Sequence, residues 1–456
     1  MRLTEVADAV VLWFRQDLRL SDQAALAVAA AEGPVIPVYV LDDDGPGQWR
    51  IGAAQRWWLH HSIAALDESL RAGGSRLILR RGRAATELAK LVEETGAGAV
   101  HAIAHQEPWW RLAEAQVARH LDLRLHPGNT LAPPEAITNA AGEPFQIFSA
   151  FWRALSAEMP PSPPARAPSR IPAPSRWPVS DRLDDWVLRP TRPDWSIGFG
   201  DWTPGEAGAK ARLARFVARA ADYADARDRP SAEGTSRLSP HLHFGEISSA
   251  QVWHAVPQAQ AFLRELVWRD FSRGVIAAMP DYGDRNGRAR FDRLEWRSGA
   301  AAMRDFRAWT KGMTGYPIVD AGMRQLWATG WMHNRVRMIV ASFLTKHLLI
   351  DWRRGERWFW DTLVDADYGN NSVNWQWVSG TGIDSNPFGR IMAPLLQSRK
   401  FDAAGYIRRW VPELAAIGDE AIHDPHDAGC APPGYPEKII GHREGRARAL
   451  AAGREV

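Results

Sequence analysis

The sequence lacks several features that define common classes of protein. Cys430 is the only cysteine among the 456 residues, which excludes a disulfide framework, a cysteine-rich zinc site and a cysteine-ligated iron–sulfur cluster within this chain and fits a reducing cytosol. No run of about 18 uninterrupted apolar residues occurs, so that no transmembrane helix is expected. Residues 1–9 carry charges and do not resemble a secretory signal. We therefore expect a cytoplasmic protein with no membrane partner.

The first third also lacks a GxGxxG phosphate loop, although its pattern alternates between strands and helices. Short apolar runs at 9–14, 35–42, 76–82 and 99–105 are separated by stretches of helical character. Alternation at this spacing predicts a Rossmann-like parallel α/β sheet with helices on both faces. The functional side chains of such a sheet usually lie at the carboxyl ends of its strands.

A connector and a long helical region follow. Residues 159–194 are rich in proline, serine and arginine, which predicts an irregular segment, either an ordered strap between domains or a disordered linker. Beyond about residue 205, apolar residues recur with helical spacing and no comparable strand pattern is present. The sequence therefore predicts an α/β domain over 1–130, a linker over 131–204 and an all-helical domain over 205–456.

Charge is distributed unevenly along the chain, whose formal net charge is only +3. Residues 1–130 contain 14 Lys and Arg against 16 Asp and Glu, a net charge of −2. Residues 264–360 contain 18 against 10, a net charge of +8. This asymmetry indicates a polyanionic partner for the later region, although a solvated basic face is the simpler explanation from charge alone.

The segment GTSRLSPHLHFG (234–245) places glycine and hydroxyl residues before a helical stretch. Backbone N–H groups and hydroxyls at a helix start form an anion site, and Arg237 adds a permanent positive charge. Plain N-capping of the helix by Thr235 or Ser236 is the alternative.

The segment WMHNRVRM (331–338) interleaves basic side chains with flat apolar ones. Each polar residue taken alone is best explained as solvent-facing. The cluster as a whole suits a nucleic-acid groove, in which Arg meets phosphate and aromatic rings stack on bases.

Oxygen ligands gather in the segment DADYGNN (365–371). They would suit a hard metal ion, but the EF-hand spacing and its closing Glu are absent. We therefore reject calcium and predict no metal site.

Two of the 23 tryptophans, Trp375 and Trp377, flank a single glutamine. On a helix, a separation of two residues rotates side chains by about 200°, so that the two indoles would point in opposite directions. The alternative is that both fill core space, which is the usual position of a Trp.

These segments belong to a set of motifs that resembles the DNA photolyase/cryptochrome family. In chain order the motifs are LWFRQDLRLSD, GTSRLSPHL, ELVWRDF, TGYPIVDAGMRQL, GWMHNRVRM and NWQWVSGTG. The resemblance extends from Val10 to about Tyr435 and is greatest to bacterial cyclobutane pyrimidine dimer photolyases, in particular to the class III branch. It implies an N-terminal antenna-binding domain and a C-terminal helical FAD-binding domain.

The resemblance implies a deoxyribodipyrimidine photo-lyase, a carbon–carbon lyase. Its reaction would be light-driven repair of cyclobutane pyrimidine dimers in DNA by electron transfer from reduced FAD to the flipped-out lesion. A cryptochrome-type blue-light photoreceptor with the same fold and FAD is the alternative. A nucleotide-dependent ligase or transferase would require a phosphate loop in the first domain, which is absent. A monomer is expected by similarity.

The resemblance also assigns residues to FAD. Asn371 matches the family position that faces flavin N5, where photolyases carry Asn. The full set implied to hold FAD is Tyr223, Thr235, Ser236, Arg237, Leu238, Ser239, Arg269, Asn334, Asp365, Asp367 and Asn371.

For the lesion, the resemblance implies a pocket walled by Trp268 and Trp377. Glu265 would hydrogen-bond the pyrimidine edges with Asn334 nearby, and Arg335 would point toward phosphate. Extruding a damaged base costs less than extruding an intact one, so that the lesion itself contributes selectivity.

The resemblance further implies a photoreduction wire. It would run from Trp375 through Trp352 to Trp309 at the surface.

The expected specificity and antenna rest on departures from the family pattern. (6-4) photolyases have an essential His where this chain has His333-Asn334 and Met338, which favours cyclobutane dimers. The antenna segment AIAHQEPWW (102–110) has Ile103 and Gln106 where relatives tend to have Asn and Tyr, although Glu107 is retained. We expect methenyltetrahydrofolate from the class III resemblance and from RWWLHHS (56–62), or an altered or lost antenna.

Overall fold

The computed structural model describes residues 8–386 and 391–454, and it begins with a parallel α/β domain. A single five-stranded sheet has the order β3-β2-β1-β4-β5, with all neighbours parallel. The strands are β1 (Val10–Phe14), β2 (Val35–Leu41), β3 (Ile78–Arg81), β4 (Ala99–Ile103) and β5 (Leu123–His126). This topology confirms the predicted Rossmann-like sheet.

Helices cover both faces of the sheet because β1 buries side chains on both sides. Val10, Leu12 and Phe14 pack with α1 (Ala24–Glu32) and α2 (Ala53–Ala72). The alternate residues of β1 pack on the other face, against α3 (Ala84–Thr95) and α4 (Pro108–Ala118). A strand buried on both faces reads as a continuous apolar run, which is why the sequence revealed it.

The fifth strand was not predicted. β5 has the sequence LRLH, lies at the edge of the sheet and is only partly buried. Four residues that alternate between apolar and basic carry too little pattern to separate a short edge strand from a loop.

The connector between the domains is an ordered strap that runs along the sheet. It contains α5 (Phe148–Ser156) and three short 3-10 helices (134–136, 183–186 and 196–199). Backbone hydrogen bonds tie it to the first domain, from Val35 N to Pro172 O (2.7 Å) and from Asp181 N to Leu79 O (2.9 Å). Of the two predicted alternatives, the structure has the strap.

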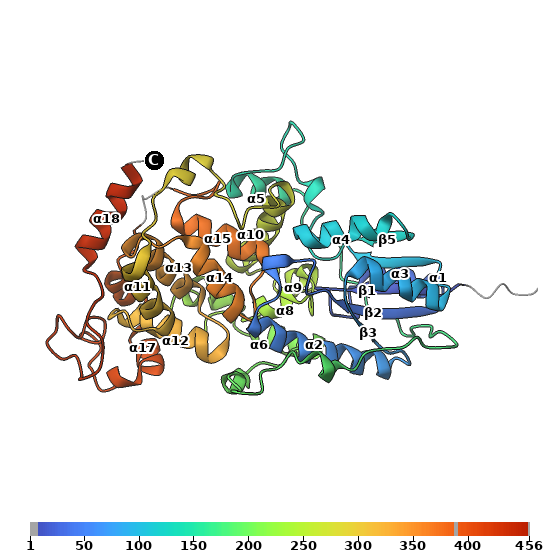
Figure 1. Ribbon diagram of the computed structural model, residues 1–456, viewed down its shortest axis with the longest axis horizontal. Helices are drawn as coiled ribbons and strands as arrows, with labels where there is room; N and C mark the ends of the chain where they lie inside the picture. Colours follow the sequence, from blue (N-terminus) through green and yellow to red (C-terminus); the bar gives the residue numbers. More distant parts are fainter. Residues whose placement is uncertain (1–7, 387–390, 455–456) are drawn as a thin grey trace, which may run out of the picture.

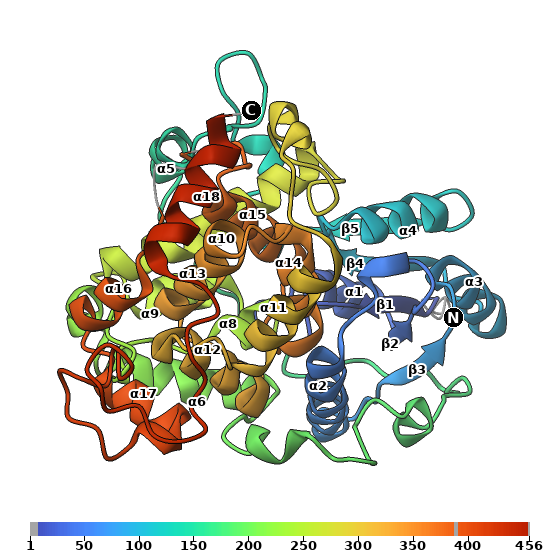
Figure 2. The same cartoon turned by 60° about the vertical axis from the view of Figure 1, so that its left-hand side comes forward.

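The remaining chain is helical, and Figures 1 and 2 place it beside the sheet, with α18 at the far end. Its helix α15 (Tyr368–Ser379) packs against α10 (Gln260–Ala278), α13 (Asn334–Ser342) and α14 (Trp352–Thr362). The other helices are α6 (Glu206–Val217), α7 (Tyr223–Ala226), α8 (Ser239–His243), α9 (Ser249–Ala255), α11 (Gly299–Lys311), α12 (Pro317–Thr329), α16 (Pro394–Lys400), α17 (Ala404–Trp410) and α18 (His442–Arg454). No helix in the described ranges is long and apolar enough to cross a membrane.

Two stretches with continuous helical spacing of apolar residues are each divided in the structure. The stretch 205–226 forms α6 and α7 with a 3-10 turn (220–222) between them, and 331–350 forms α13 followed by a π-helical turn (343–347). The apolar spacing continues through both breaks, which is why the pattern did not reveal them.

Candidate functional site

The helices of the second domain enclose a cavity of about 460 Å³. It lies among α8, α10, α13 and α15, and its lining combines residues from distant parts of the sequence. Predicted site residues that line it are Tyr223, Thr235, Ser236, Arg237, Leu238, Ser239, Glu265, Trp268, Arg269, Asn334, Arg335, Asp365, Asp367, Asn371, Trp375 and Trp377. One cavity thus holds both the residues predicted for a cofactor and those predicted for a lesion.

The segment 234–239 approaches the cavity as a loop and not as a capped helix. α8 begins only at Ser239, and its N-cap position is Leu238, which has no side-chain cap. Ser236 Oγ accepts a hydrogen bond from Leu238 N at 3.3 Å. The alternative in which Thr235 or Ser236 caps the helix is therefore wrong.

Arg237 is held in an unusual conformation at this loop. Its φ of +52° lies in the left-handed region, where a non-glycine residue persists only if its surroundings impose it. The guanidinium lies over the rings of Trp202 (4.3 Å) and Trp331 (5.1 Å). Burial lowers the pKa of Arg237 to about 10, so that it stays charged at neutral pH. Its Nε has no hydrogen-bond partner in the described part of the chain.

Asp365 offers a second unused polar atom. Its Oδ2 accepts from Ser239 Oγ (2.6 Å) and from Arg337 Nη2 (2.8 Å). Its buried Oδ1 has no partner among the described residues. Sequence reasoning did not assign Arg337 to the cofactor, although it lies two residues beyond Arg335 in a motif already singled out.

A buried ionic network joins this cavity to the first domain. Arg273 Nη2 lies 3.3 Å from Asp367 Oδ2 and 3.8 Å from Glu107 Oε1. Burial alone would raise the pKa of Glu107, but the charge of Arg273 and the contact with His105 lower it to about 2. The pKa of Asp367 is likewise lowered against the effect of its burial, by His243 and Arg273. Both carboxylates are therefore ionised at neutral pH.

Arg269 lines the cavity, but its guanidinium donates mainly to backbone carbonyls of the protein. Nη1 donates to Asn129 O (2.5 Å), and Nη2 donates to Leu242 O (3.0 Å). Burial lowers its pKa to about 10. Arg269 therefore also clamps the end of the first domain onto α8.

The predicted lesion residues lie on one side of the cavity. Glu265 Oε1 accepts from Arg227 Nη1 at 2.7 Å, which orients the carboxylate. The indole of Trp268 stacks on Phe148, with ring centroids 3.6 Å apart and planes within 3°. Arg227 and Phe148 were not predicted as site residues, since neither lies in one of the motifs.

Arg335 is committed to a protein partner. Its Nη2 donates to Asp228 Oδ1 at 2.6 Å, and its guanidinium lies 4.5 Å from the Phe401 ring centroid. Its predicted role toward phosphate stays a prediction, and it would require exchange of this ion pair.

The two tryptophans of NWQW occupy different environments on α15. Trp375 is buried, with its ring centroid 6.3 Å from that of Trp309 and 5.0 Å from that of Phe359. Trp377 is half-buried and also lines a neighbouring groove that contains Phe148. Both indoles also line the central cavity, so that their opposite directions stay a prediction.

Trp309 does not lie at the surface. It is fully buried, and its Nε1 donates to Val340 O at 3.1 Å. Trp352 is also fully buried and donates to Asn286 Oδ1 at 2.9 Å. The expected surface end of the wire at Trp309 is therefore wrong, because α13 supplies the carbonyl that covers the indole N–H.

Asn371 is oriented by a hydrogen bond to the backbone carbonyl of Glu356, a buried acidic residue. Its Nδ2 donates to Glu356 O at 3.1 Å, and the adjacent Ser372 Oγ donates to Glu356 Oε1 at 2.5 Å. Burial raises the pKa of Glu356 well above its usual value. Burial therefore favours the protonated, neutral form of this carboxyl.

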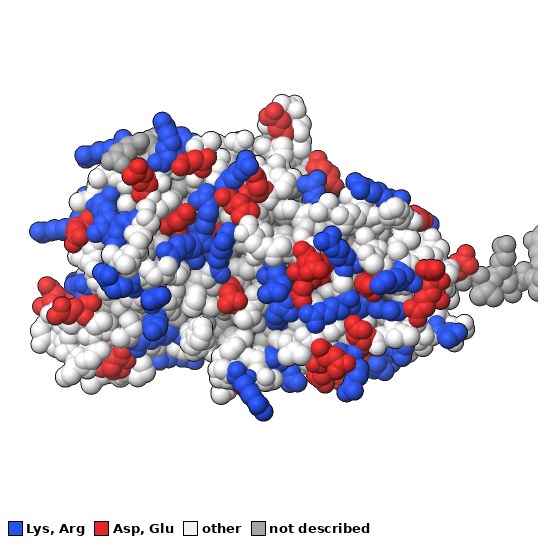
Figure 3. Space-filling model, viewed as in Figure 1, with Lys and Arg blue, Asp and Glu red and all other residues white. Residues whose placement is uncertain are grey.

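Basic and acidic side chains are mixed on the visible face of the helical part, where Figure 3 shows Lys and Arg interspersed with Asp and Glu. Ion pairs such as Arg297–Asp305 (2.8 Å) and Arg353–Asp351 (3.2 Å) explain this mixture.

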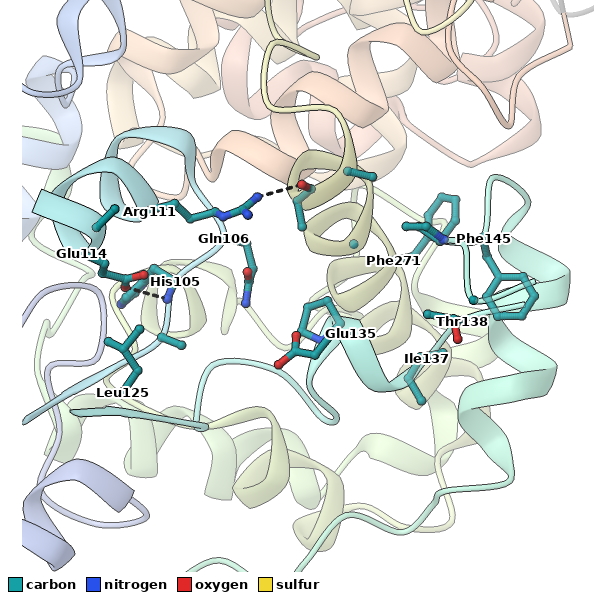
Figure 4. A pocket seen from close by; sticks show the side chains of 18 of the residues that line it. His105, Gln106, Arg111, Glu114, Leu125, Glu135, Ile137, Thr138, Phe145 and Phe271 are labelled. Carbon is teal, nitrogen blue, oxygen red and sulfur yellow. Dashed lines mark hydrogen bonds between the residues drawn. The ribbon is translucent and has the colours of Figure 1, made fainter. Parts of the chain in front are cut away.

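A second cavity, of about 620 Å³, lies between the domains. Its walls come from the loop after β4 (104–106), α4 and β5 on one side, and from the C-terminal half of α10 with residues between 134 and 151 on the other. Gln106 and Glu135 extend into it (Figure 4). Glu107 points elsewhere, toward Arg273 and His105. Residues 56–62 lie on α2, across the sheet from α4. Of the two segments that suggested an antenna site, 102–110 lines this cavity with Ala104, His105 and Gln106, whereas 56–62 does not line it.

A parallel α/β domain followed by a helical domain with a polar central cavity defines a flavoprotein of the photolyase type. The family model for DNA photolyase matches residues 10–170, and the model for the FAD-binding domain of DNA photolyase matches residues 262–455. The chain belongs to the DNA photolyase family.

Comparison with individual relatives gives the same family. The chain is 46% identical to a deoxyribodipyrimidine photo-lyase of Agrobacterium fabrum, with 97% of each chain covered. It is 35% identical to cryptochrome-1 of Arabidopsis thaliana, with 96% of this chain and 69% of that protein covered. The crystal structure of a bacterial class III photolyase from Agrobacterium tumefaciens matches with a TM-score of 0.94 and 45% identity, and each chain is covered in full.

The cavity fits the FAD that the family model implies. A diphosphate needs a positive charge and N–H or O–H donors, which Arg237 and the hydroxyls of Thr235, Ser236 and Ser239 provide. The unpartnered atoms Arg237 Nε and Asp365 Oδ1 are a donor and an acceptor available to such a ligand. Within the described ranges, no three His, Cys, Asp or Glu side chains gather closely enough to hold a metal ion.

Proposed function

We propose that this protein repairs cyclobutane pyrimidine dimers in DNA in a light-dependent reaction, as a deoxyribodipyrimidine photo-lyase. The observation that carries the proposal is that Glu265, Trp268 and Trp377 line the same cavity as the cofactor loop 235–239. A flipped-out lesion would therefore lie within contact distance of the cofactor.

The residues of the chain bind and orient the two reactants. Reduced FAD, when bound, supplies the photoexcited electron that splits the cyclobutane ring. Trp268 and Trp377 offer flat apolar surfaces for the unstacked pyrimidines, since stacking on aromatic rings is worth about 1–3 kcal/mol per base. Glu265, held by Arg227, accepts hydrogen bonds from pyrimidine N–H groups.

The residues near the lesion pocket favour cyclobutane dimers over (6-4) photoproducts. His333 is the N-cap of α13, and its Nδ1 accepts from Arg335 N at 3.2 Å. Burial lowers the pKa of His333 to about 4, so that it is neutral at physiological pH and unable to donate a proton as an imidazolium. Met338 lines the cavity and has no proton to give.

The test is a light-minus-dark repair assay. Reduced protein is mixed with oligothymidylate that carries cyclobutane dimers, and thymine absorbance is followed under near-ultraviolet or blue light. We expect recovery only in light. A yellow, photoreducible protein that restores no absorbance would instead be a cryptochrome-type photoreceptor, and it should bind damaged and undamaged DNA alike.

We further propose that the cavity between the domains holds a light-harvesting folate, methenyltetrahydrofolate. Its volume of about 620 Å³ lies in the range of small-molecule sites, and its lining is mainly apolar with a few polar groups. Gln106 and Glu135 offer donors and acceptors to a pterin edge (Figure 4).

A substitution in α10 tests this antenna site. Gly274 lines the cavity, and a Cβ added there meets no atom within 4 Å. Gly274→Leu should therefore fill the cavity without disturbing the helix, remove the antenna absorption band and leave repair by direct flavin excitation intact. Gly274→Ala, which leaves most of the space, is the control. An antenna band that persists in the Leu variant would place the chromophore elsewhere.

We also propose that the protein acts as a monomer in the bacterial cytoplasm. Light scattering after size exclusion, with and without dimer-containing DNA, tests the oligomeric state, and a mass near 50.9 kDa for the free protein is expected.

A further inference from the structure

The lesion-pocket wall Trp268 is part of a layered aromatic cluster. Its indole and the ring of Phe148 are parallel within 3°, with centroids 3.6 Å apart. Phe271 meets both rings edge-on, at 5.6 Å from Trp268 and 5.8 Å from Phe148. The two edge-to-face contacts of Phe271 are a favourable arrangement of aromatic rings, whereas the Phe148–Trp268 pair is overlaid almost directly, which is less favourable than an offset stack.

Ring contacts are what fixes the plane of this indole. Within the described residues no hydrogen bond to the Trp268 indole N–H occurs, whereas the indoles of Trp309 and Trp352 are each anchored by one. Phe148 is 2% exposed and is itself held by its backbone N–H, which donates to Asp384 Oδ2 at 3.2 Å. A buried, anchored ring therefore supports a half-buried one.

Phe148 covers the face of Trp268 that is turned away from the flavin cavity. Trp268 lines two hollows, the flavin cavity and a neighbouring groove of about 260 Å³. Phe148 lines only the groove. Because one indole face is occupied by Phe148, only the opposite face remains for a flipped-out base.

We propose that Phe148 is a positioning residue of the lesion pocket, which holds the Trp268 indole in the plane on which the pyrimidine dimer stacks. The inference rests on the proposed repair function and deepens it. Without Phe148 the indole would be free to rotate, and ordering it on binding would reduce affinity for the lesion. The effect falls on recognition of the dimer, and not on flavin binding, because Phe148 does not line the flavin cavity.

The experiment compares Phe148→Leu with Phe151→Leu. Phe151 lies on the same helix and contacts the same Phe271 (5.6 Å), but it makes no ring contact with Trp268 among the described residues. The measurement is the ratio of dark dissociation constants for dimer-containing and undamaged oligothymidylate, together with flavin content. We expect the ratio to fall roughly three- to tenfold in Phe148→Leu and to stay at the wild-type value in Phe151→Leu.

Two further variants separate positioning from general damage. Phe148→Tyr keeps the ring and should restore discrimination, whereas Phe148→Leu in a Trp268→Ala background should cause no additional loss. If Phe148→Leu lost its flavin, Phe148→Met, which keeps the volume without a ring, takes its place. If Phe148→Leu discriminates between damaged and undamaged DNA as well as wild type does, this inference alone is overturned. If the wild-type protein itself does not discriminate, the proposed function is overturned with it.

Discussion

The edge of the sheet and the cavity of the helical domain use buried charge in opposite ways. At the carboxyl end of β1, Arg15 Nη1 donates to Glu114 Oε1 at 2.5 Å, and Arg15 Nη2 donates to Ile103 O. In the helical cavity, Arg237 Nε and Asp365 Oδ1 are buried without a partner in the described part of the chain. Arg15 Nε is unpartnered among the described residues as well, so the contrast is that Arg15 faces a carboxylate at the sheet edge, whereas the unused atoms of Arg237 and Asp365 belong to residues that line a cavity.

A flavoprotein can contain a Rossmann-like sheet that lacks a phosphate loop, because its flavin need not bind at that sheet. In open α/β sheets, ligands usually bind beyond the carboxyl ends of the strands. Here that position is partly closed by protein side chains such as Arg15 and Glu114, and the dinucleotide site lies in the other domain. The sheet contributes, through β5, part of the wall of the larger cavity between the domains.

The largest expected effect comes from breaking the pair at the sheet edge. Arg15→Ala leaves the carboxylate of Glu114 buried without its cation, which should reduce the free energy of unfolding by about 3–5 kcal/mol. Urea denaturation of the flavin-free protein measures it. Replacing both partners, as in Arg15→Met with Glu114→Leu, should recover much of the loss, and a double variant as unstable as the single one would contradict the explanation.

Removing the charge of Arg237 from the cavity should have the opposite effect: it should weaken flavin binding and leave the flavin-free protein stable. Arg237→Ala removes a charged donor to the FAD diphosphate, so that flavin affinity should fall by about 10- to 100-fold while the flavin-free protein stays stable. The ratio of flavin to protein absorbance after purification reports this. Arg212→Ala is the matched control, since Arg212 also lies over Trp202 but does not line the cavity. Equal flavin loss in both variants would point to the Trp202 stack as the cause.

The same comparison can be made with aromatic residues. Trp360 belongs to an interdomain cluster with Trp49 (5.4 Å) and Trp109 (6.2 Å), whereas Trp375 lines the flavin cavity. Trp375→Phe should slow photoreduction of FAD severalfold and spare repair by pre-reduced protein, and Trp360→Phe should leave both rates unchanged. Flavin absorbance recorded during timed illumination distinguishes the two variants. Normal photoreduction in Trp375→Phe would remove it from the wire.

The smallest expected effect concerns a buried carboxyl that, unlike Glu114, has no salt bridge. The raised pKa of Glu356 means that its folded form holds a proton that the unfolded chain releases above its ordinary pKa near 4.5. Stability from this group is therefore complete below that pH and is lost as pH rises toward the folded pKa. As pH rises from about 4.5 toward the folded pKa, wild type should lose stability relative to Glu356→Gln, by at most about 1.4 kcal/mol per pH unit. Parallel pH profiles of melting temperature would show that Glu356 is ionised in the folded state.

Local patterns predicted the parts of the fold whose information is local. Continuous apolar runs marked β1 to β4, and the segment NWQW lies on a helix, α15. β5 was missed because an edge strand of four residues has little burial to pattern. The family motifs supplied the cavity lining from Thr235 to Trp377.

What the sequence could not provide is pairing between distant segments. Phe148 lies in a stretch predicted as linker, so that its stack on Trp268 is invisible until α5 and α10 are brought together. The burial of Trp309 likewise depends on α13, which supplies the Val340 carbonyl. Arg335, predicted for phosphate, is diverted by Asp228, which lies 107 residues away.

Three neighbouring residues of α10 decide whether the two domains can behave as independent units. Arg269 donates to Asn129 O, Asp270 Oδ2 accepts from Leu131 N at 2.6 Å, and Arg273 approaches Glu107. Each of these contacts crosses from the helical part to the first 131 residues. If the two halves were expressed separately, the helical half would carry this charged stripe beside its cofactor site without its counterparts. The division visible in the sequence is therefore a boundary of architecture only, and we expect the two halves to fold, melt and be inherited as one unit.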